Sequence, residues 1–174
     1  DQTEVTNAQY VKFLNQIVES AEIVDDEVIY YHCYPIYDLI CDSCPRDNRI
    51  TWDGTQFNTL SEYRELPVVM VSWYGAQEYC AWAGGQLPTE AQWEYAARGP
   101  EGNPYPWGDF TDCARGNFDD ETLWDQYVVE GGEGCDGYQD KAPVGSFPEG
   151  ASWVGVLDMS GNVKEWIADW KGGY

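Results

Sequence analysis

Large aromatic side chains, rather than aliphatic repeats, make up much of the apolar content of this chain. Its 174 residues include nine Trp and thirteen Tyr, with 18 Gly and 9 Pro, while long periodic runs of Leu, Ile and Val are scarce. A buried aromatic removes roughly 150–250 Å² from water, so a core can form without long regular elements. The composition therefore predicts a loop-rich fold, and the length predicts one domain over residues 1–174.

The nine tryptophans divide into two expected groups. One group is expected to fill the core. The other is expected to lie exposed, where its rings would stack on sugars or other ligands. The core group is Trp73, Trp82, Trp93, Trp107, Trp166 and Trp170, and the exposed group is Trp52, Trp124 and Trp153.

Three segments have helical periodicity and capping residues, which makes the expected fold class α+β. In the first, Thr6 is the N-cap and Gln9 follows at the spacing of a capping box. Ser72 and Thr89 each predict the start of a further helix, and a glycine follows the end of each. Short strands are expected within EVIYYHCY, RITW, PVVMVS, KAPVGSF and GVLDMSGNVKEWIADW.

The chain is strongly acidic, with a formal net charge of −22. This charge argues against nucleic-acid binding and against anionic membrane surfaces, because both partners are negative. No run of about 18 apolar residues is present, so no membrane insertion is expected. The carboxylates favour either a solvated extracellular surface or hard cations, which prefer oxygen ligands.

Six cysteines in an acidic chain indicate disulfides and a secreted, extracellular or periplasmic location. The chain begins at Asp1 without Met, which fits removal of a secretion signal. A zinc site of His32, Cys33, Cys41 and Cys44 is the alternative, but adjacent His32 and Cys33 fit one tetrahedral centre poorly. Open pairings remain among Cys33, Cys41, Cys44 and Cys80.

Five motifs stand in the order found in one protein family. They are EVTNAQYVKFL, PVVMVSWYGAQEYCAWAGGQLPTEAQWEYAARG, YPWGD, APVGSFP and GVLDMSGNVKEWIADW. From Glu4 to Trp170 the chain resembles the formylglycine-generating enzyme family, also called sulfatase-modifying factor domains. The resemblance implies a variant of the C-type lectin fold with little regular secondary structure.

Known members of that family differ in activity. Its enzymes oxidise a cysteine of sulfatases to formylglycine with O₂ and copper, relatives carry out sulfoxide-forming iron chemistry, and others are non-catalytic binding modules. Here Lys164 replaces a tryptophan that faces the enzymes' active-site groove, and their C-terminal copper-binding cysteine pair is missing. Soft Cu(I) needs thiolate or thioether ligands. Copper and catalytic residues are therefore not expected, and the domain is expected to be incomplete at one or both ends.

The resemblance also implies two calcium sites. The ligands of the first are the side chains of Asp158 and Glu165 and the carbonyls of Gly161 and Val163. Ca²⁺ takes about 6–8 oxygens, and a glycine-containing turn can aim carbonyls between carboxylates. The residues alone favour a plainer alternative, in which Asp158 caps a turn and Glu165 is solvated. The second set is Asn117, Phe118, Asp136 and Tyr138.

A disulfide between Cys113 and Cys135 is predicted, because both lie just outside the ligands of the second implied site. It would close a loop of about 23 residues and stabilise the fold by about 3 kcal/mol. Its more specific effect would be to hold the two halves of that calcium site together.

These observations favour a secreted, calcium-stabilised, non-catalytic binding or structural module. Its partner would be an unidentified protein or glycan, or further copies of itself in an extracellular assembly. One alternative is a formylglycine-generating oxidase, or a related sulfoxide-forming iron enzyme, whose C-terminal catalytic segment lies outside this sequence. The other is a carbohydrate-binding lectin-like protein.

Overall fold

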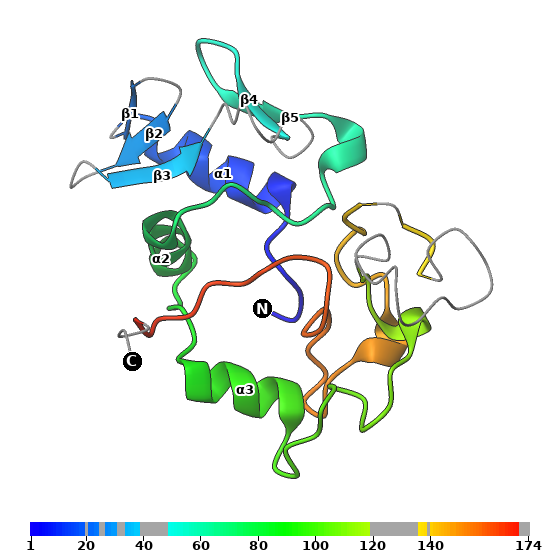
Figure 1. Ribbon diagram of the computed structural model, residues 1–174. Coiled ribbons are helices and arrows are strands. Elements are labelled where there is room, and N and C mark those ends of the chain that lie inside the picture. The colour runs from blue at the N-terminus through cyan, green and yellow to red at the C-terminus, as the bar shows by residue number, and fades with distance from the viewer. Residues whose placement is uncertain are drawn as a thin grey trace. The chain divides into compact units, whose positions relative to one another are not determined.

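The chain consists of two compact units, each of which joins segments far apart in the sequence (Figure 1). Unit 1 comprises Asp1–Glu4 and Glu90–Glu165, and unit 2 comprises Val5–Thr89 and Trp166–Tyr174. The expected single domain stays a prediction. The computed structural model describes residues 1–19, 21–24, 27–30, 34–38, 49–118, 136–138 and 140–170, the three ranges between 21 and 38 by backbone alone.

Helix α1 (Asn7–Ile17) supplies most of the core of unit 2. It begins with the predicted capping box. The Thr6 hydroxyl accepts from the Gln9 N–H at 3.2 Å, and the Gln9 side chain accepts from the Thr6 N–H at 2.8 Å. The predicted apolar face is buried, apart from the half-buried Val18. The buried cluster consists of Tyr10, Phe13, Leu14, Ile17, Ile50, Phe57 and Tyr79.

Loss of the cap is expected to destabilise α1. Thr6→Ala removes the acceptor of the Gln9 N–H, so the free energy of unfolding should fall by about 1 kcal/mol. Urea denaturation followed by circular dichroism measures the change. Thr6→Ser keeps the hydroxyl and is the control, and equal stability of the alanine and serine variants would contradict a contribution from the cap.

The strands of unit 2 form two separate antiparallel sheets. Strands near residues 27–34 and 49–52 were expected, and both are confirmed. The three-stranded sheet has the order β1 (Ala21–Val24), β2 (Glu27–Tyr30) and β3 (Tyr34–Asp38), and the second pairs β4 (Ile50–Trp52) with β5 (Phe57–Thr59).

Helix α2 (Trp73–Trp82) and the short 3-10 helix η1 (Ser61–Tyr63) complete the regular structure described in unit 2. The Ser72 hydroxyl caps α2 by accepting the Gly75 N–H at 3.1 Å, as predicted. Helix α2 contacts α1 and β3, and α1 contacts β5 (Figure 1). The strand expected just before α2 is reduced to isolated bridge residues at Pro67 and Val71.

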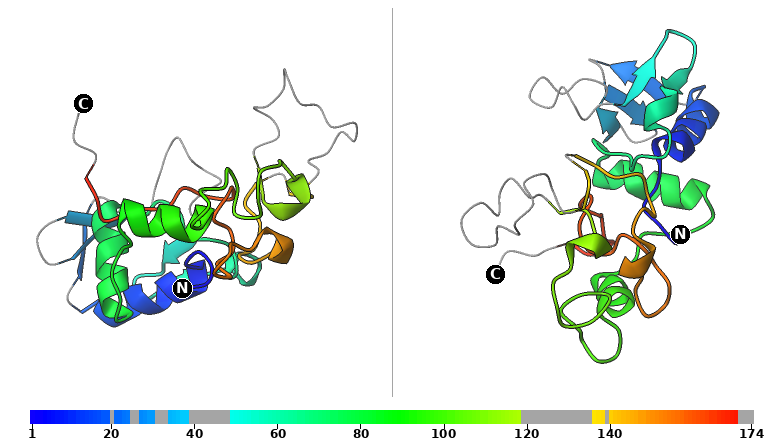
Figure 2. Two further views of the ribbon diagram at one scale, coloured as in Figure 1. Left: turned by 90° about the horizontal axis from the view of Figure 1, so that it is seen from below. Right: turned by 90° about the vertical axis from the view of Figure 1, so that its right-hand side faces the viewer.

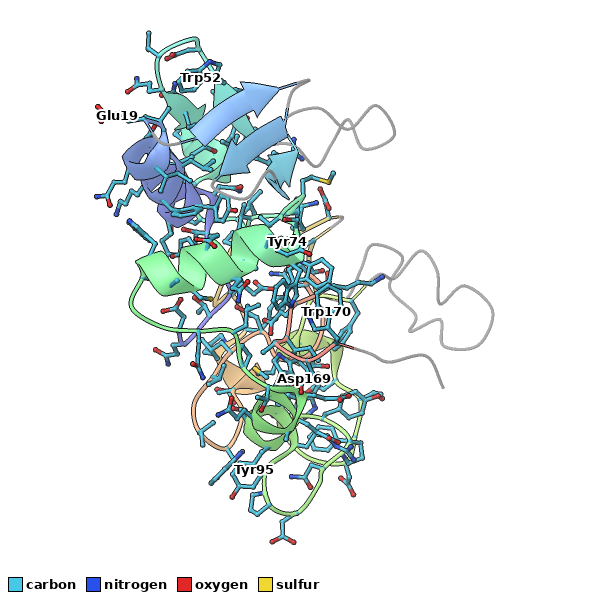
Figure 3. All side chains as sticks on the ribbon, turned by 90° about the vertical axis from the view of Figure 1, so that its left-hand side faces the viewer. Glu19, Trp52, Tyr74, Tyr95, Asp169 and Trp170 are labelled. Atoms are coloured by element: carbon cyan, nitrogen blue, oxygen red, sulfur yellow. The ribbon has the colours of Figure 1, made fainter. Side chains whose placement is uncertain are left out.

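The expected tryptophan core is wrong. Indole N–H groups need acceptors, and these tryptophans reach acceptors from partly exposed positions. Trp73 donates to the Ile167 carbonyl at 2.7 Å, and Trp166 donates to the Val71 carbonyl at 2.9 Å. Trp170 is 74% exposed (Figure 3). In this expected core group, Trp73, Trp93 and Trp107 are half-buried, while Trp82, Trp166 and Trp170 are exposed.

The expectation that a second group of tryptophans lies at the surface is confirmed in part. Trp153 is exposed and Trp52 is half-buried. Trp124 lies outside the described residues. The core of unit 2 therefore depends on the smaller aromatic and aliphatic side chains of α1 and its neighbours rather than on tryptophan.

Unit 1 is built from loops around three short helices. The first ends at Gly99, whose φ of 67° is left-handed, as the sequence predicted for a glycine stop. The second and third lie side by side (Figure 2), and the guanidinium of Arg115 joins them by donating to the Glu149 carbonyl. The three are α3 (Glu90–Arg98), η2 (Cys113–Arg115) and η3 (Pro148–Gly150).

The strands expected in residues 141–147 and 155–170 are wrong, because the described residues there form turns and bends. Left-handed backbone interrupts both segments, at Gly145 (φ 72°), Asp158 (φ 59°) and Asn162 (φ 58°). Such residues cannot continue an extended ladder. The described elements confirm a loop-rich α+β fold, and none of the described helices combines the length and apolarity that crossing a membrane requires.

Candidate metal centre

The loop of residues 157–165 in unit 1 is shaped by close contact with Asn117. Gly161 has a φ of 100°, and a Cβ built there would lie 2.2 Å from the Asn117 carbonyl oxygen. The next residue, Asn162, donates its backbone N–H to the same carbonyl at 2.7 Å. Only glycine fits this position, so the turn predicted from the sequence is enforced by its neighbour.

Three carboxylates influence one another in this loop. Glu4, at the N-terminal end of unit 1, is 8% exposed, and burial raises its pKa to about 8. A hydrogen bond from Asn162 partly offsets that effect, while the charges of Asp158 and Glu165 raise the pKa further. The Glu4 Oε1 atom is buried and forms no hydrogen bond of ordinary geometry among the described residues, although the backbone N–H of Val163 lies close enough to favour the charged carboxylate.

The two predicted acidic ligands share this environment. Burial raises the pKa of Asp158, and a hydrogen bond from the Gly145 N–H, at 2.6 Å, acts in the opposite direction. Burial of its carboxylate also raises the pKa of Glu165, although the residue as a whole is exposed. The Trp93 indole donates to Glu165 and favours its charged form. Negative charge is thus concentrated where water solvates it poorly.

The negative charge of these carboxylates would be compensated by a bound hard cation. An orphaned carboxylate oxygen and two further acids near it are donors that Ca²⁺ prefers. Within the described ranges, no three His, Cys, Asp or Glu side chains are grouped closely enough to hold a metal by themselves. The carbonyls predicted at Gly161 and Val163 would therefore have to contribute.

The structure also brings together the second predicted set. The carboxylate of Asp136 accepts the N–H groups of Phe118 at 2.9 Å and Tyr138 at 2.8 Å. The Asn117 Nδ2 donates to the Asp140 carbonyl at 2.7 Å, which leaves its amide oxygen as the atom to face a cation. Asp136 is the single carboxylate of this set and already holds two hydrogen bonds, so we expect it to bind calcium more weakly than the first.

Glu4 is the site residue that sequence reasoning missed. It lies in the EVTN motif that begins the chain's family resemblance, two residues before the cap of α1. An acid beside an apolar residue and a cap is a weak signal, and its loop partner Asn162 is 158 positions away.

The structure gives the positions of some other residues singled out in the sequence, and the rest lie outside the described residues. Lys164 is exposed. The half-buried Cys80 is a free thiol whose pKa is raised by burial. Cys113 lies in η2, but Cys135 is outside the described residues, so their disulfide stays a prediction. The zinc alternative of His32, Cys33, Cys41 and Cys44 also lies outside the described residues.

Comparison with known proteins settles the family. Residues 1–173 match the family model described as the sulfatase-modifying factor enzyme 1-like domain. The chain belongs to this family. The match covers both sets of predicted ligands, and it confirms the resemblance found in the five sequence motifs.

The chain is similar to relatives whose names indicate different activities. The inactive C-alpha-formylglycine-generating enzyme 2 of Mus musculus is 44% identical over 110 residues, which are 63% of this chain and 34% of that protein. The formylglycine-generating enzyme of Mycobacterium tuberculosis is 33% identical over 186 residues, covering 93% of this chain and 60% of that protein. The chain thus spans about a third to three-fifths of these relatives.

One solved structure shows the same fold. PvdO from Pseudomonas aeruginosa superposes with a TM-score of 0.56 at 23% sequence identity, covering 98% of this chain and 56% of PvdO. At this identity the likeness concerns the fold and not the activity.

Proposed function

We propose that this chain is a calcium-stabilised, non-catalytic binding or structural module with a variant of the C-type lectin fold. The observation that carries the proposal is the buried, unpartnered Oε1 of Glu4 beside Asp158 and Glu165. An ionised carboxylate in that position needs a compensating charge. A cation supplied by the surroundings would meet this need, because no basic group is among the causes that shift the pKa of Glu4, although the N-terminal ammonium acts on Glu165.

Calcium is the ion whose chemistry matches the donors. Glu4, Asp158 and Glu165 would supply carboxylate oxygens, and Gly161 and Val163 would supply backbone carbonyls, with water completing about 6–8 ligands. Zinc and copper favour nitrogen or sulfur donors, which these five residues lack. When bound, the ion would supply charge neutralisation and hold the loop against the N-terminal segment.

Conservative amides in place of the acids test the site. Glu165→Gln and Asp158→Asn each remove one negative ligand without changing side-chain volume, so the dissociation constant for calcium should rise by about tenfold or more. Isothermal titration calorimetry of the chelator-stripped protein measures it. Glu101→Gln removes an exposed acid elsewhere in unit 1 and is the matched control. Equal effects of all three substitutions would argue for unspecific charge attraction rather than a site.

The non-catalytic part of the proposal is supported by chemistry rather than by the relatives. Residues 136–174 contain no cysteine, and the exposed Lys164 stands where the family's enzymes carry a groove tryptophan. We therefore propose no copper centre within these residues. The similarity to a relative whose name includes "inactive" agrees with this, but relatives named as formylglycine-generating enzymes match comparably well.

The alternative function is formylglycine generation by a longer protein that contains these residues, and the Mycobacterium tuberculosis relative is the observation in its favour. Incubation of the 174-residue chain with copper, O₂ and a peptide carrying the sulfatase cysteine is expected to give no aldehyde, as measured by mass spectrometry. The enzyme from that relative serves as positive control. Clear turnover would overturn the non-catalytic proposal.

Location and partners complete the proposal. We propose a secreted or periplasmic protein with a Cys113–Cys135 disulfide, which peptide mapping without reductant would detect. Its partner would be a protein, a glycan or a second copy. In favour is an exposed aromatic pair in unit 1, where the rings of Tyr95 (Figure 3) and Trp153 lie 5.1 Å apart and are 53% and 51% exposed. A glycan array probed with and without chelator distinguishes the lectin-like alternative.

A further inference from the structure

One side-chain amide links the two proposed calcium sites. The Asn162 Nδ2 donates to the Glu4 carboxylate at 2.8 Å, and the Asn162 Oδ1 accepts from the Asn117 Nδ2 at 2.9 Å. Glu4 belongs to the first proposed site and Asn117 to the second. A ligand of one site is thus two hydrogen bonds from a ligand of the other, in what we name the amide chain, Asn117–Asn162–Glu4.

We propose that calcium binding at the two sites is positively coupled through this amide chain. The inference rests on the proposed function, because it requires both sites to bind calcium. It adds a regulatory property that neither ligand set has alone, in that occupancy of one site sets the affinity of the other.

The direction of the hydrogen bonds determines the sign of the coupling. A cation on the Asn117 amide oxygen withdraws electron density, which makes its Nδ2–H a stronger donor to Asn162. Polarisation of the Asn162 amide then strengthens its own donation to Glu4, since linked hydrogen bonds reinforce one another. That bond also fixes the orientation of the Glu4 carboxylate, so filling the second site preorganises a ligand of the first. By thermodynamic linkage, calcium at the first site raises the affinity of the second site by the same factor.

The amide of Asn162 is held in the orientation that the coupling needs. The Ala142 N–H donates to its Oδ1 at 2.9 Å, and its Nδ2 donates to the Ala142 carbonyl at 3.2 Å. Rotation of the Asn162 amide by half a turn would point its NH₂ group at the Ala142 N–H and its oxygen at the Ala142 carbonyl, and neither pair can form a hydrogen bond. The backbone bond from Asn162 to the Asn117 carbonyl, at 2.7 Å, fixes the main chain as well.

Repulsion between two bound cations acts against positive coupling. The two proposed sites together contain four carboxylates, those of Glu4, Asp158, Glu165 and Asp136. Their combined negative charge balances that of two divalent ions, so the region is close to neutral when both sites are filled. We therefore expect the hydrogen-bonded coupling to exceed the ionic repulsion.

Calorimetric titration of the chelator-stripped chain with CaCl₂ tests the coupling. In the wild type the second ion should bind at least about fivefold more tightly than two independent sites would allow. Asn162→Gly permits the left-handed backbone and leaves every proposed ligand in place, but removes the amide, so it should abolish the coupling. Asn103→Gly makes the same change elsewhere in unit 1 as a control.

A second measurement follows the first site alone. The indole N–H of Trp93 donates to Glu165, so its NMR signal should report calcium at that site. Asp136→Asn weakens the second site, and should move the Trp93 titration to at least about fivefold higher calcium in the wild-type background. In the Asn162→Gly background Asp136→Asn should leave it unmoved.

The outcomes separate the two proposals. Binding of two independent ions, binding of one ion only, or coupling that survives in Asn162→Gly would each overturn the amide chain and leave the calcium function standing. An absence of calcium binding by the wild type would overturn the proposed function, and the coupling with it.

Discussion

Removal of calcium at about pH 8 is expected to lower the thermal midpoint of the protein by about 5–10 °C. An ion at about 100 times its dissociation constant adds about 2.7 kcal/mol to the free energy of unfolding. Each kcal/mol shifts the midpoint of a chain of this size by roughly 2–4 °C. Without the ion, the buried carboxylates of Glu4 and Asp158 and the nearby Glu165 lose the positive charge that the proposed site would hold. Differential scanning calorimetry in excess CaCl₂ and in EDTA measures the difference.

The same experiment is expected to depend on pH. Burial sets the pKa of Glu4 at about 8 in the fold, against an ordinary 4.5. Between these values the metal-free fold retains a proton that the unfolded chain has released, so the contribution of Glu4 to metal-free stability is full below about pH 4.5 and is lost as the pH rises through about 8. Calcium binds the ionised form, so its stabilising effect should be smaller near pH 5.5 than near pH 8.

Glu4→Gln is the informative variant for this prediction. It keeps the shape of the side chain but cannot ionise, so it should lose most of the calcium-dependent shift and the pH slope of the metal-free protein. Glu101→Gln should retain both. If the midpoint is the same in EDTA and in calcium at both pH values, neither proposed calcium site contributes to stability.

Gly161→Ala is expected to destabilise the protein by roughly 3 kcal/mol or more, combining left-handed strain with overpacking. The added methyl carbon would lie 2.2 Å from the Asn117 carbonyl oxygen, and backbone atoms on both sides must move to relieve the clash. The thermal midpoint should fall by about 6–12 °C. Because the movement separates Asn117 from the loop, calcium affinity should fall with stability.

Gly155→Ala provides the matched comparison. Gly155 also has a left-handed backbone, with φ of 80°, but a Cβ there would meet no atom within 4 Å. The Gly155→Ala substitution should lower the free energy of unfolding only by the conformational strain, about 1–2 kcal/mol, and calcium binding should be unchanged. Similar losses for the two variants would show that backbone conformation, rather than the contact with Asn117, limits Gly161.

The sequence predicted the helices well because their determinants are local. The capping box of Thr6 and Gln9 and the cap at Ser72 each involve residues three positions apart. The strands expected beyond residue 140 failed because alternating apolar residues do not show where φ becomes positive. Tryptophan burial failed for a different reason. An indole N–H can find a carbonyl at a partly exposed position, and composition carries no information about that acceptor.

The candidate site was predictable only in part. Asp158, Gly161, Val163 and Glu165 lie within eight positions of one motif, so their shared loop could be anticipated. The involvement of Glu4 could not, because it depends on a chain reversal that brings the start of the sequence to the loop. Periodicity and spacing describe neighbours along the chain, whereas the orphaned oxygen arises from neighbours in space.

The hydrogen bond between Glu4 and Asn162 joins residues 158 positions apart. Contacts of such long range close slowly, and a chain emerges from the ribosome N-terminus first. Helix α1 can therefore acquire its cap early in synthesis, while the loop that receives Glu4 is still untranslated. Calcium at the proposed first site could therefore stabilise only a chain that has been translated past this loop.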